Sequence, residues 1–207
     1  AILCGVDTDC GQAEAIVLLN FFDVETATGE RSVELHVGDL PTLGLDVDLL
    51  VVSAFEGDYT PVPRTLLGRL YQEYGLLLSD LPIALDLRRS PLKSWVSAPL
   101  DLTPSTDTQT CFRSLAVIEG AVTFEPGNLL PWPPFNRLFS LLALLPMRRI
   151  ACGSVASPLL GSGDQGIAPL EHYPDLLEAY RMGFQHVPDL RRLILFARTE
   201  EHLSPLG

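Results

Sequence analysis

The sequence has few basic residues and no long uninterrupted apolar run. Its 207 residues include 14 Lys or Arg and 26 Asp or Glu, which gives a formal net charge of −12. Because this charge repels phosphate groups, we expect neither nucleic acid nor a membrane as a partner, although a local nucleotide pocket stays compatible with it. The longest apolar stretch, residues 139–147, is interrupted by Ser140 and Pro146 and is too short to span a bilayer.

The sequence also lacks cysteine pairs and a targeting segment. The four cysteines, Cys4, Cys10, Cys111 and Cys152, form no C-x-x-C pair, and no His stands at metal-ligand spacing from them. We therefore expect free thiols, no metal site and no cofactor. No basic region precedes an apolar core at the start, so a signal peptide is not predicted. Together these absences predict a cytoplasmic protein.

Alternating strand and helix patterns predict an α/β fold. Two strands around Thr28-Gly29 predict a hairpin over about residues 15–37. Apolar runs typical of strands occur at 47–55, 112–119, 149–155 and 193–197. Helical patterns occur at 66–74, 135–145 and 170–182, with Gly75 and Gly183 ending the first and last. This order predicts a three-layer α/β/α sandwich around a central mixed, mostly parallel sheet, with the runs at 47–54 and 149–155 as interior strands.

No repeat, linker or low-complexity tract divides the chain, so a single domain over residues 1–207 is predicted. Residues 79–110 contain four prolines and little periodicity. This composition indicates a long irregular insertion, with short strands near 83–87 and 95–96.

The most informative segment is the glycine-rich run Ser-Pro-Leu-Leu-Gly-Ser-Gly-Asp-Gln-Gly at 157–166, between a predicted strand and a predicted helix. Its glycines permit positive φ, and consecutive N–H groups beside a helix start form an anion-binding nest. The run lacks the Gly-Lys-Ser/Thr of a P-loop, and no acidic residue completes a dinucleotide fingerprint. Taken alone, it is either a phosphate-binding loop or a tight turn that binds nothing.

Three segments in order carry a resemblance to a known family. They are Val-Glu-Leu-His-Val-Gly-Asp-Leu at 33–40, Val-Asp-Leu-Leu-Val-Val-Ser-Ala-Phe at 47–55, and the glycine run from Pro158 to Gly166. Together they resemble the macro domain, an ADP-ribose-binding α/β/α module, over about residues 30–200. The glycine run further resembles macro-type domains of bacterial signalling or anti-phage proteins. The resemblance implies a small nucleotide as ligand and an attached or associated effector as a partner.

The resemblance also implies a set of ligand-binding residues. Asp39 matches the carboxylate that accepts a hydrogen bond from the adenine amino group, and the glycine run matches the loop around the diphosphate and distal ribose. The implied set is Asp39, Leu40, Ser53, Ala54, Gly161, Ser162, Gly163, Asp164, Gln165 and Gly166.

One departure from the family pattern bears on catalysis. Hydrolytic relatives have Asn-Ala-Ala-Asn where this chain has Val52-Ser53-Ala54-Phe55. An apolar ring cannot orient water or accept a hydroxyl proton, so no catalytic residue is assigned. The leading hypothesis is a non-catalytic nucleotide sensor. The alternatives are an ADP-ribosyl hydrolase with rearranged groups, for which Glu56 and Asp58 are the candidate acid and base, and an interaction module without ligand.

Aromatic residues and histidines are further candidates for the site. Trp95, Trp132 and Tyr59 are able to stack on a base, but core or lid packing is the default for each. His36 is predicted to lie on the solvated face of a strand. No G-x-S-x-G motif supports a serine nucleophile.

Overall fold

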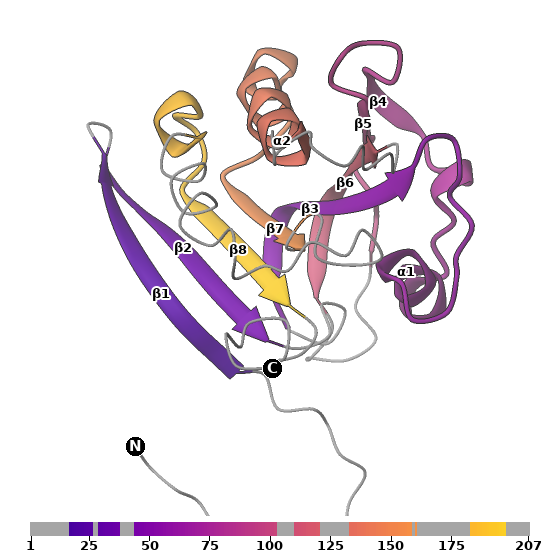
Figure 1. Ribbon diagram of the computed structural model, residues 1–207, viewed down its shortest axis with the longest axis horizontal. Coiled ribbons are helices and arrows are strands. Elements are labelled where there is room, and N and C mark those ends of the chain that lie inside the picture. Colours follow the sequence, from indigo (N-terminus) through magenta and orange to yellow (C-terminus); the bar gives the residue numbers. More distant parts are fainter. Residues whose placement is uncertain are drawn as a thin grey trace, which may run out of the picture.

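Eight strands form one mixed sheet, in the order β1-β2-β8-β7-β3-β6-β5-β4 (Figure 1). The computed structural model describes residues 17–26, 29–37, 44–102, 110–120, 133–158, 160 and 183–197. The strands are β1 (Val17–Thr26), β2 (Gly29–Val37), β3 (Asp46–Phe55), β4 (Ile83–Asp86), β5 (Ser94–Ser97), β6 (Cys111–Gly120), β7 (Ser154–Pro158) and β8 (Arg192–Ala197). Within the run β2-β8-β7-β3-β6 each strand is parallel to its neighbours in the run. The pairs β1–β2, β6–β5 and β5–β4 are antiparallel.

Helices cover both faces of the sheet, which confirms the predicted α/β/α sandwich. The helix α1 (Leu66–Tyr74) packs on one face and α2 (Pro133–Leu144) on the other (Figure 1). Each helix contributes to a separate cluster of buried apolar side chains. The α1 layer includes Leu67 and Leu70, and the α2 layer includes Leu138, Leu141 and Leu142. Burial of these two layers supplies the main favourable term in folding.

The helix α1 forms as its sequence predicts. The Thr65 hydroxyl caps its start by accepting a hydrogen bond from Gly68 N at 3.1 Å. Gly75 ends it in the left-handed conformation, at φ 66°, which favours glycine. Tyr71 is 48% exposed, so the buried stripe is narrower than the apolar spacing suggests.

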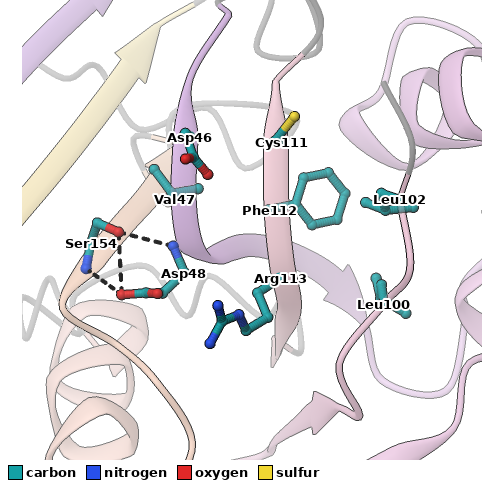
Figure 2. A pocket seen from close by; sticks show the side chains of 9 residues that line it. All are labelled: Asp46, Val47, Asp48, Leu100, Leu102, Cys111, Phe112, Arg113 and Ser154. Carbon is teal, nitrogen blue, oxygen red and sulfur yellow. Dashed lines mark hydrogen bonds between the residues drawn. The ribbon is translucent and has the colours of Figure 1, made fainter. Parts of the chain in front are cut away.

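The strands β3 and β6 form the buried centre of the sheet, as their apolar runs predict. Along β3, Val47 and Leu50 face the α1 layer, whereas Leu49 and Val51 face the α2 layer. Strict alternation would place Val47 with Leu49, so the strand changes phase near Asp48. Figure 2 shows that β3 also bends there, beside Asp48.

The strand predicted at 149–155 begins later than expected. A short helix, η3 (Pro146–Arg148), follows α2, and Arg149 after it adopts the left-handed region at φ 58°. Because that conformation cannot continue a strand, β7 starts at Ser154 and extends to Pro158. The interior position is confirmed, since β7 pairs with both β8 and β3.

Gly183 does not end a helix, contrary to the sequence prediction. The backbone is helical from 183 to 186. A Cβ atom on Gly183 would lie 2.4 Å from the Phe139 ring of α2. Close packing therefore explains the glycine here, because any side chain would meet that ring.

Within the proline-rich segment 79–110, the described residues 79–102 contribute two short strands to the sheet. After the short helix η2 (Leu78–Asp80), β4 and β5 form where short strands are predicted. They extend the sheet beyond β6, because β5 pairs antiparallel with both β4 and β6. In the described part of the chain, no helix is long and apolar enough to cross a membrane.

Candidate functional site

The carboxyl ends of β2, β8, β7, β3 and β6 meet at one edge of the sheet because these strands are parallel. Ser53, which is exposed, and Ala54, which is half-buried, lie there at the end of β3. Asp39 and Leu40 follow β2, and the run from Gly161 to Gly166 follows β7; both segments lie outside the described residues. Their convergence on one ligand stays a prediction, although the strands that precede them end at the same edge.

The chain leaves β3 and β7 toward opposite faces of the sheet at this edge. After β3 it enters α1 on one face. After β7 it reaches residues 183–190, where Phe184, Val187 and Leu190 pack in the α2 layer on the other face. Two adjacent parallel strands with diverging connections form a topological switch point, where α/β sheets place their ligands.

Pairing between β3 and β7 is short. It covers only Leu49 with Val155 and Leu50 with Ala156, although β3 continues to Phe55. The end of β3 pairs instead with β6, where Phe55 lies opposite Gly120.

Phe55 presents its ring to solvent at the end of β3, with 48% of the residue exposed. Alternation from Val51 places Ser53 and Phe55 on the face that α2 covers. The chain then turns: Asp58 N donates to Phe55 O at 3.1 Å, and Gly57 adopts φ 72°. A left-handed residue in this turn favours glycine. The exposed ring offers only carbon atoms to this edge of the sheet.

The two candidate acid–base residues are engaged elsewhere. The Glu56 carboxylate accepts from Lys93 Nζ at 2.7 Å. Asp58 Oδ1 accepts from Thr60 N at 3.0 Å, and hydrogen bonds from Thr60 lower the pKa of Asp58 below 3.8. A carboxylate whose pKa is lowered is a weak proton acceptor, so Asp58 is poorly suited as a general base near neutral pH.

Three side chains behind this turn form the Tyr59 cluster, which consists of Tyr59, Trp95 and Glu119. The Tyr59 hydroxyl donates to Glu119 Oε1 and accepts from Trp95 Nε1 at 3.0 Å. Burial and the Glu119 carboxylate raise the pKa of Tyr59 above 10.0, against the opposing influence of Arg88 and Trp95. The hydroxyl therefore stays protonated and donates throughout the neutral range.

The Tyr59 cluster shows how Trp95, one of the candidate stacking residues, is placed. Trp95 is 1% exposed, so it packs in the core and is not available for base stacking. Trp132 lies outside the described residues. Sequence reasoning missed Glu119, although a carboxylate next to Gly120 at the end of an apolar strand was the available signal.

His36 is buried, so its predicted place on a solvated face is wrong. Its Nε2 lies 2.9 Å from Glu34 Oε2, and Arg192 makes two hydrogen bonds to the same carboxylate at 2.6 and 2.9 Å. Burial pushes the pKa of Glu34 upward, but hydrogen bonds and charges from Arg192 and His36 outweigh it and hold the pKa below 4.5. These partners let a polar pair occupy an inward-facing position on β2.

A cavity of about 340 Å³ lies at the opposite, amino-terminal edge of the sheet (Figure 2). It is lined by Asp46, Val47, Asp48, Leu100, Leu102, Cys111, Phe112, Arg113 and Ser154. On one wall, Asp48 N donates to Ser154 Oγ at 2.9 Å, and Ser154 N donates to Asp48 Oδ2 at 3.1 Å. These bonds join β3 to β7 just before their backbone pairing begins. Ser53 and Ala54, the two members of the predicted ligand-binding set that the structure describes, do not line this cavity.

The described cysteines are both free thiols, Cys111 half-buried and Cys152 buried. Burial and the nearby charges of Asp189 and Asp48 raise the pKa of Cys152 to about 11. The residues that the structure describes include no group of three or more His, Cys, Asp or Glu able to hold a metal ion.

The fold is similar to that of solved macrodomains. The Oceanobacillus iheyensis macrodomain with ADP is 12% identical, with a TM-score of 0.56, over 92% of this chain and 93% of that one. The same macrodomain with MES bound is 15% identical, with a TM-score of 0.56, over 89% and 92% of the two chains. The Trypanosoma brucei macrodomain in complex with ADP-ribose is 16% identical, with a TM-score of 0.54, over 83% and 66%. No family model and no curated protein matches the sequence.

Proposed function

We propose that this chain, which has the macrodomain fold, binds ADP-ribose or a related nucleotide at the carboxyl edge of its sheet. The observation that carries the proposal is the likeness to macrodomains over about nine-tenths of the chain, including one with ADP; another, over 83% of it, is in complex with ADP-ribose. The switch point between β3 and β7 supports the same edge, because it lies where ligands of open α/β sheets bind.

The proposed contacts follow from the sequence. Backbone N–H groups of Gly161, Ser162, Gly163, Asp164, Gln165 and Gly166 form the nest for the diphosphate. Asp39, with Leu40 beside it, accepts a hydrogen bond from the adenine amino group. Ser53 and Ala54 line the site from the end of β3. A net charge of −12 disfavours an anionic ligand at long range, so these local donors provide the attraction.

We further propose that binding is not coupled to hydrolysis. Cleavage of an ADP-ribosyl bond requires a positioned water and a group to activate it. Phe55 supplies neither, Glu56 is paired with Lys93, and Asp58 has a lowered pKa. The protein then acts as a sensor that passes occupancy of the site to an attached or associated effector.

Calorimetric titration with ADP-ribose and with ADP tests the binding proposal. Asp39→Asn removes the charged acceptor, and we expect a loss in affinity of about tenfold, or 1.4 kcal/mol. Gly163→Val places a branched side chain against the diphosphate and should weaken binding at least as much. Asp46→Asn is the matched control, because it makes the same change on an exposed carboxylate at the opposite edge. Absence of binding by the folded wild-type chain would favour the interaction module without ligand.

The hydrolase alternative is tested separately. Mono-ADP-ribosylated protein is incubated with the chain, and mass spectrometry measures released ADP-ribose. We expect none above the uncatalysed level. Release that Glu56→Gln or Asp58→Asn abolishes would establish a hydrolase and overturn the sensor proposal.

A further inference from the structure

The Tyr59 cluster connects the loop that follows β3 to the buried interior of the sheet. Tyr59 lies four residues beyond the end of β3, whereas Glu119 is the penultimate residue of β6 and Trp95 lies in β5. Glu119 is 2% exposed and Trp95 1%, so Tyr59 inserts its hydroxyl between two buried groups. The Tyr59 and Trp95 rings also meet edge to face, with centroids 5.8 Å apart at 72°. One side chain thus connects the loop to two strands.

Lys93 provides a second connection, on the outer side of the same loop. Its Nζ binds the Glu56 carboxylate at 2.7 Å, and its backbone O accepts from Glu119 N at 2.7 Å. Exposed ion pairs contribute little to stability, so this contact alone does not hold the loop. Lys93 is nevertheless useful as a reporter, because it is the only lysine in the sequence.

The Tyr59 cluster and Phe55 belong to opposite faces of the sheet. Alternation from Val51 places Ser53 and Phe55 on the α2 face of the sheet, whereas Tyr59 and Trp95 pack against the α1 layer. The body of β3 separates the two sets. Any influence of Tyr59 on the binding edge is therefore transmitted through the backbone of residues 55–60.

We propose that Tyr59 and Glu119 are positioning residues that hold the loop at 55–60 in the conformation that nucleotide binding requires. This inference rests on the proposed function. A loop that is already ordered loses less conformational entropy when a ligand binds, so fixing it in advance strengthens binding. The turn from Phe55 to Asp58 and the bond between Asp58 and Thr60 complete this order locally.

The test compares two tyrosine variants. Tyr59→Phe removes the hydroxyl from the Tyr59 cluster. The matched control is Tyr74→Phe, because Tyr74 is also half-buried, donates to a carbonyl (Thr110 O, 2.6 Å) and meets Phe112 edge to face. Tyr74 ends α1 and binds next to the start of β6, at the amino edge. We expect ADP-ribose affinity to fall about fivefold in Tyr59→Phe and less than about twofold in Tyr74→Phe.

A second measurement follows the loop without any nucleotide. An amine-reactive reagent is applied, and peptide mapping gives the rate of modification at Lys93. Loosening of the loop should free Lys93 from Glu56, so this rate should rise in Tyr59→Phe and stay at the wild-type value in Tyr74→Phe. Glu119→Gln should behave close to wild type, since its amide oxygen still accepts from Tyr59, whereas Glu119→Leu should behave like Tyr59→Phe.

The outcomes separate this inference from the proposed function. If wild type binds ADP-ribose and Tyr59→Phe binds equally well, the positioning role is overturned while the proposed function stands. If Lys93 reactivity is unchanged in Tyr59→Phe, the Tyr59 cluster does not hold the loop. If wild type binds no nucleotide, the proposed function fails and the role in binding fails with it, whatever the labelling shows.

Discussion

Polar side chains reinforce both ends of the sheet, but they join different kinds of structure. At the amino edge, Asp48 and Ser154 connect one strand to another, and each satisfies the backbone N–H of its partner. At the carboxyl edge, Tyr59 connects a loop to the buried ends of two strands. The first arrangement replaces backbone bonds that the separated strands cannot make. The second restrains a segment that the sheet itself leaves free.

The difference indicates a division of roles between the two edges. Strand-to-strand bonds stabilise the fold, whereas loop-to-strand bonds set the shape of a surface. The cavity beside Asp48 and Ser154 lies next to such strand-to-strand bonds, although charged groups contribute to its lining (Figure 2). We propose nucleotide binding at the opposite, carboxyl edge.

The largest effect on stability is expected from Asp48→Ala. The substitution leaves Ser154 N without its acceptor in a partly buried position, at a cost of about 1–3 kcal/mol in the free energy of unfolding. Asp46→Ala, an exposed change two residues earlier, should cost less than about 0.5 kcal/mol. Denaturant unfolding measures both. A fivefold loss of ADP-ribose affinity in folded Asp48→Ala would show that the two edges are not separate.

Much of this architecture is predictable because it depends on local pattern. Apolar runs identify β3 and β6, and the leucine spacing with Gly75 identifies α1. The start of β7 was not predictable, since it depends on the left-handed Arg149 and on bonds from Arg191 and Arg192 to Gly153. Gly183 looked like a helix end because only the packed structure places the Phe139 ring against it.

The candidate site was predictable only in part. Ser53 and Ala54 lie at the expected strand end, while Asp39, Leu40 and the glycine run stay predictions. The Tyr59 cluster joins residues that are 60 and 36 positions apart in the chain. Such contacts leave no periodic signal, because hydrophobic spacing reports burial and not the identity of a partner across the sheet.

A second prediction concerns the alkaline range. Tyr59→Phe should lower the free energy of unfolding by about 0.5–1.5 kcal/mol near neutral pH. The pKa of Tyr59 is raised in the folded state above 10.0, so its contribution is fully present below that value and is lost as the pH rises through the folded pKa. Wild type and Tyr59→Phe should therefore converge in stability at strongly alkaline pH. A constant difference across that range would mean that the hydroxyl does not supply the stability.

A third prediction concerns stability at acid pH. It uses Glu34 as a reference because this residue lies away from both edges of the sheet. The folded pKa of Glu34 lies below 4.5, so its contribution is present above that value and is lost as the pH falls through the folded pKa. Glu34→Gln should cost less than about 1 kcal/mol near neutral pH, because Arg192 stays partly solvated. Urea unfolding at several pH values should show this cost vanishing in acid. Nucleotide affinity and Lys93 labelling should both stay at wild-type values.

The smallest expected effect is the difference between two glycine substitutions. Each is made at a residue with a left-handed backbone conformation, one near each edge of the sheet. Lys93 at φ 43° precedes β5 beside the carboxyl edge, and Arg149 at φ 58° precedes β7 at the amino edge. Glycine at either position relieves about 1–2 kcal/mol of backbone strain but loses about 0.5–1 kcal/mol to the greater freedom of the unfolded chain. Arg149→Gly should therefore stabilise the protein by up to about 1 kcal/mol, measured by thermal unfolding. Lys93→Gly should gain less, because it also loses the ion pair with Glu56, which is worth about 0–1 kcal/mol when exposed. High salt screens that pair, so the two variants should become equal as salt is added. An equal gain for the two variants at low salt would show that the pair with Glu56 contributes nothing to stability.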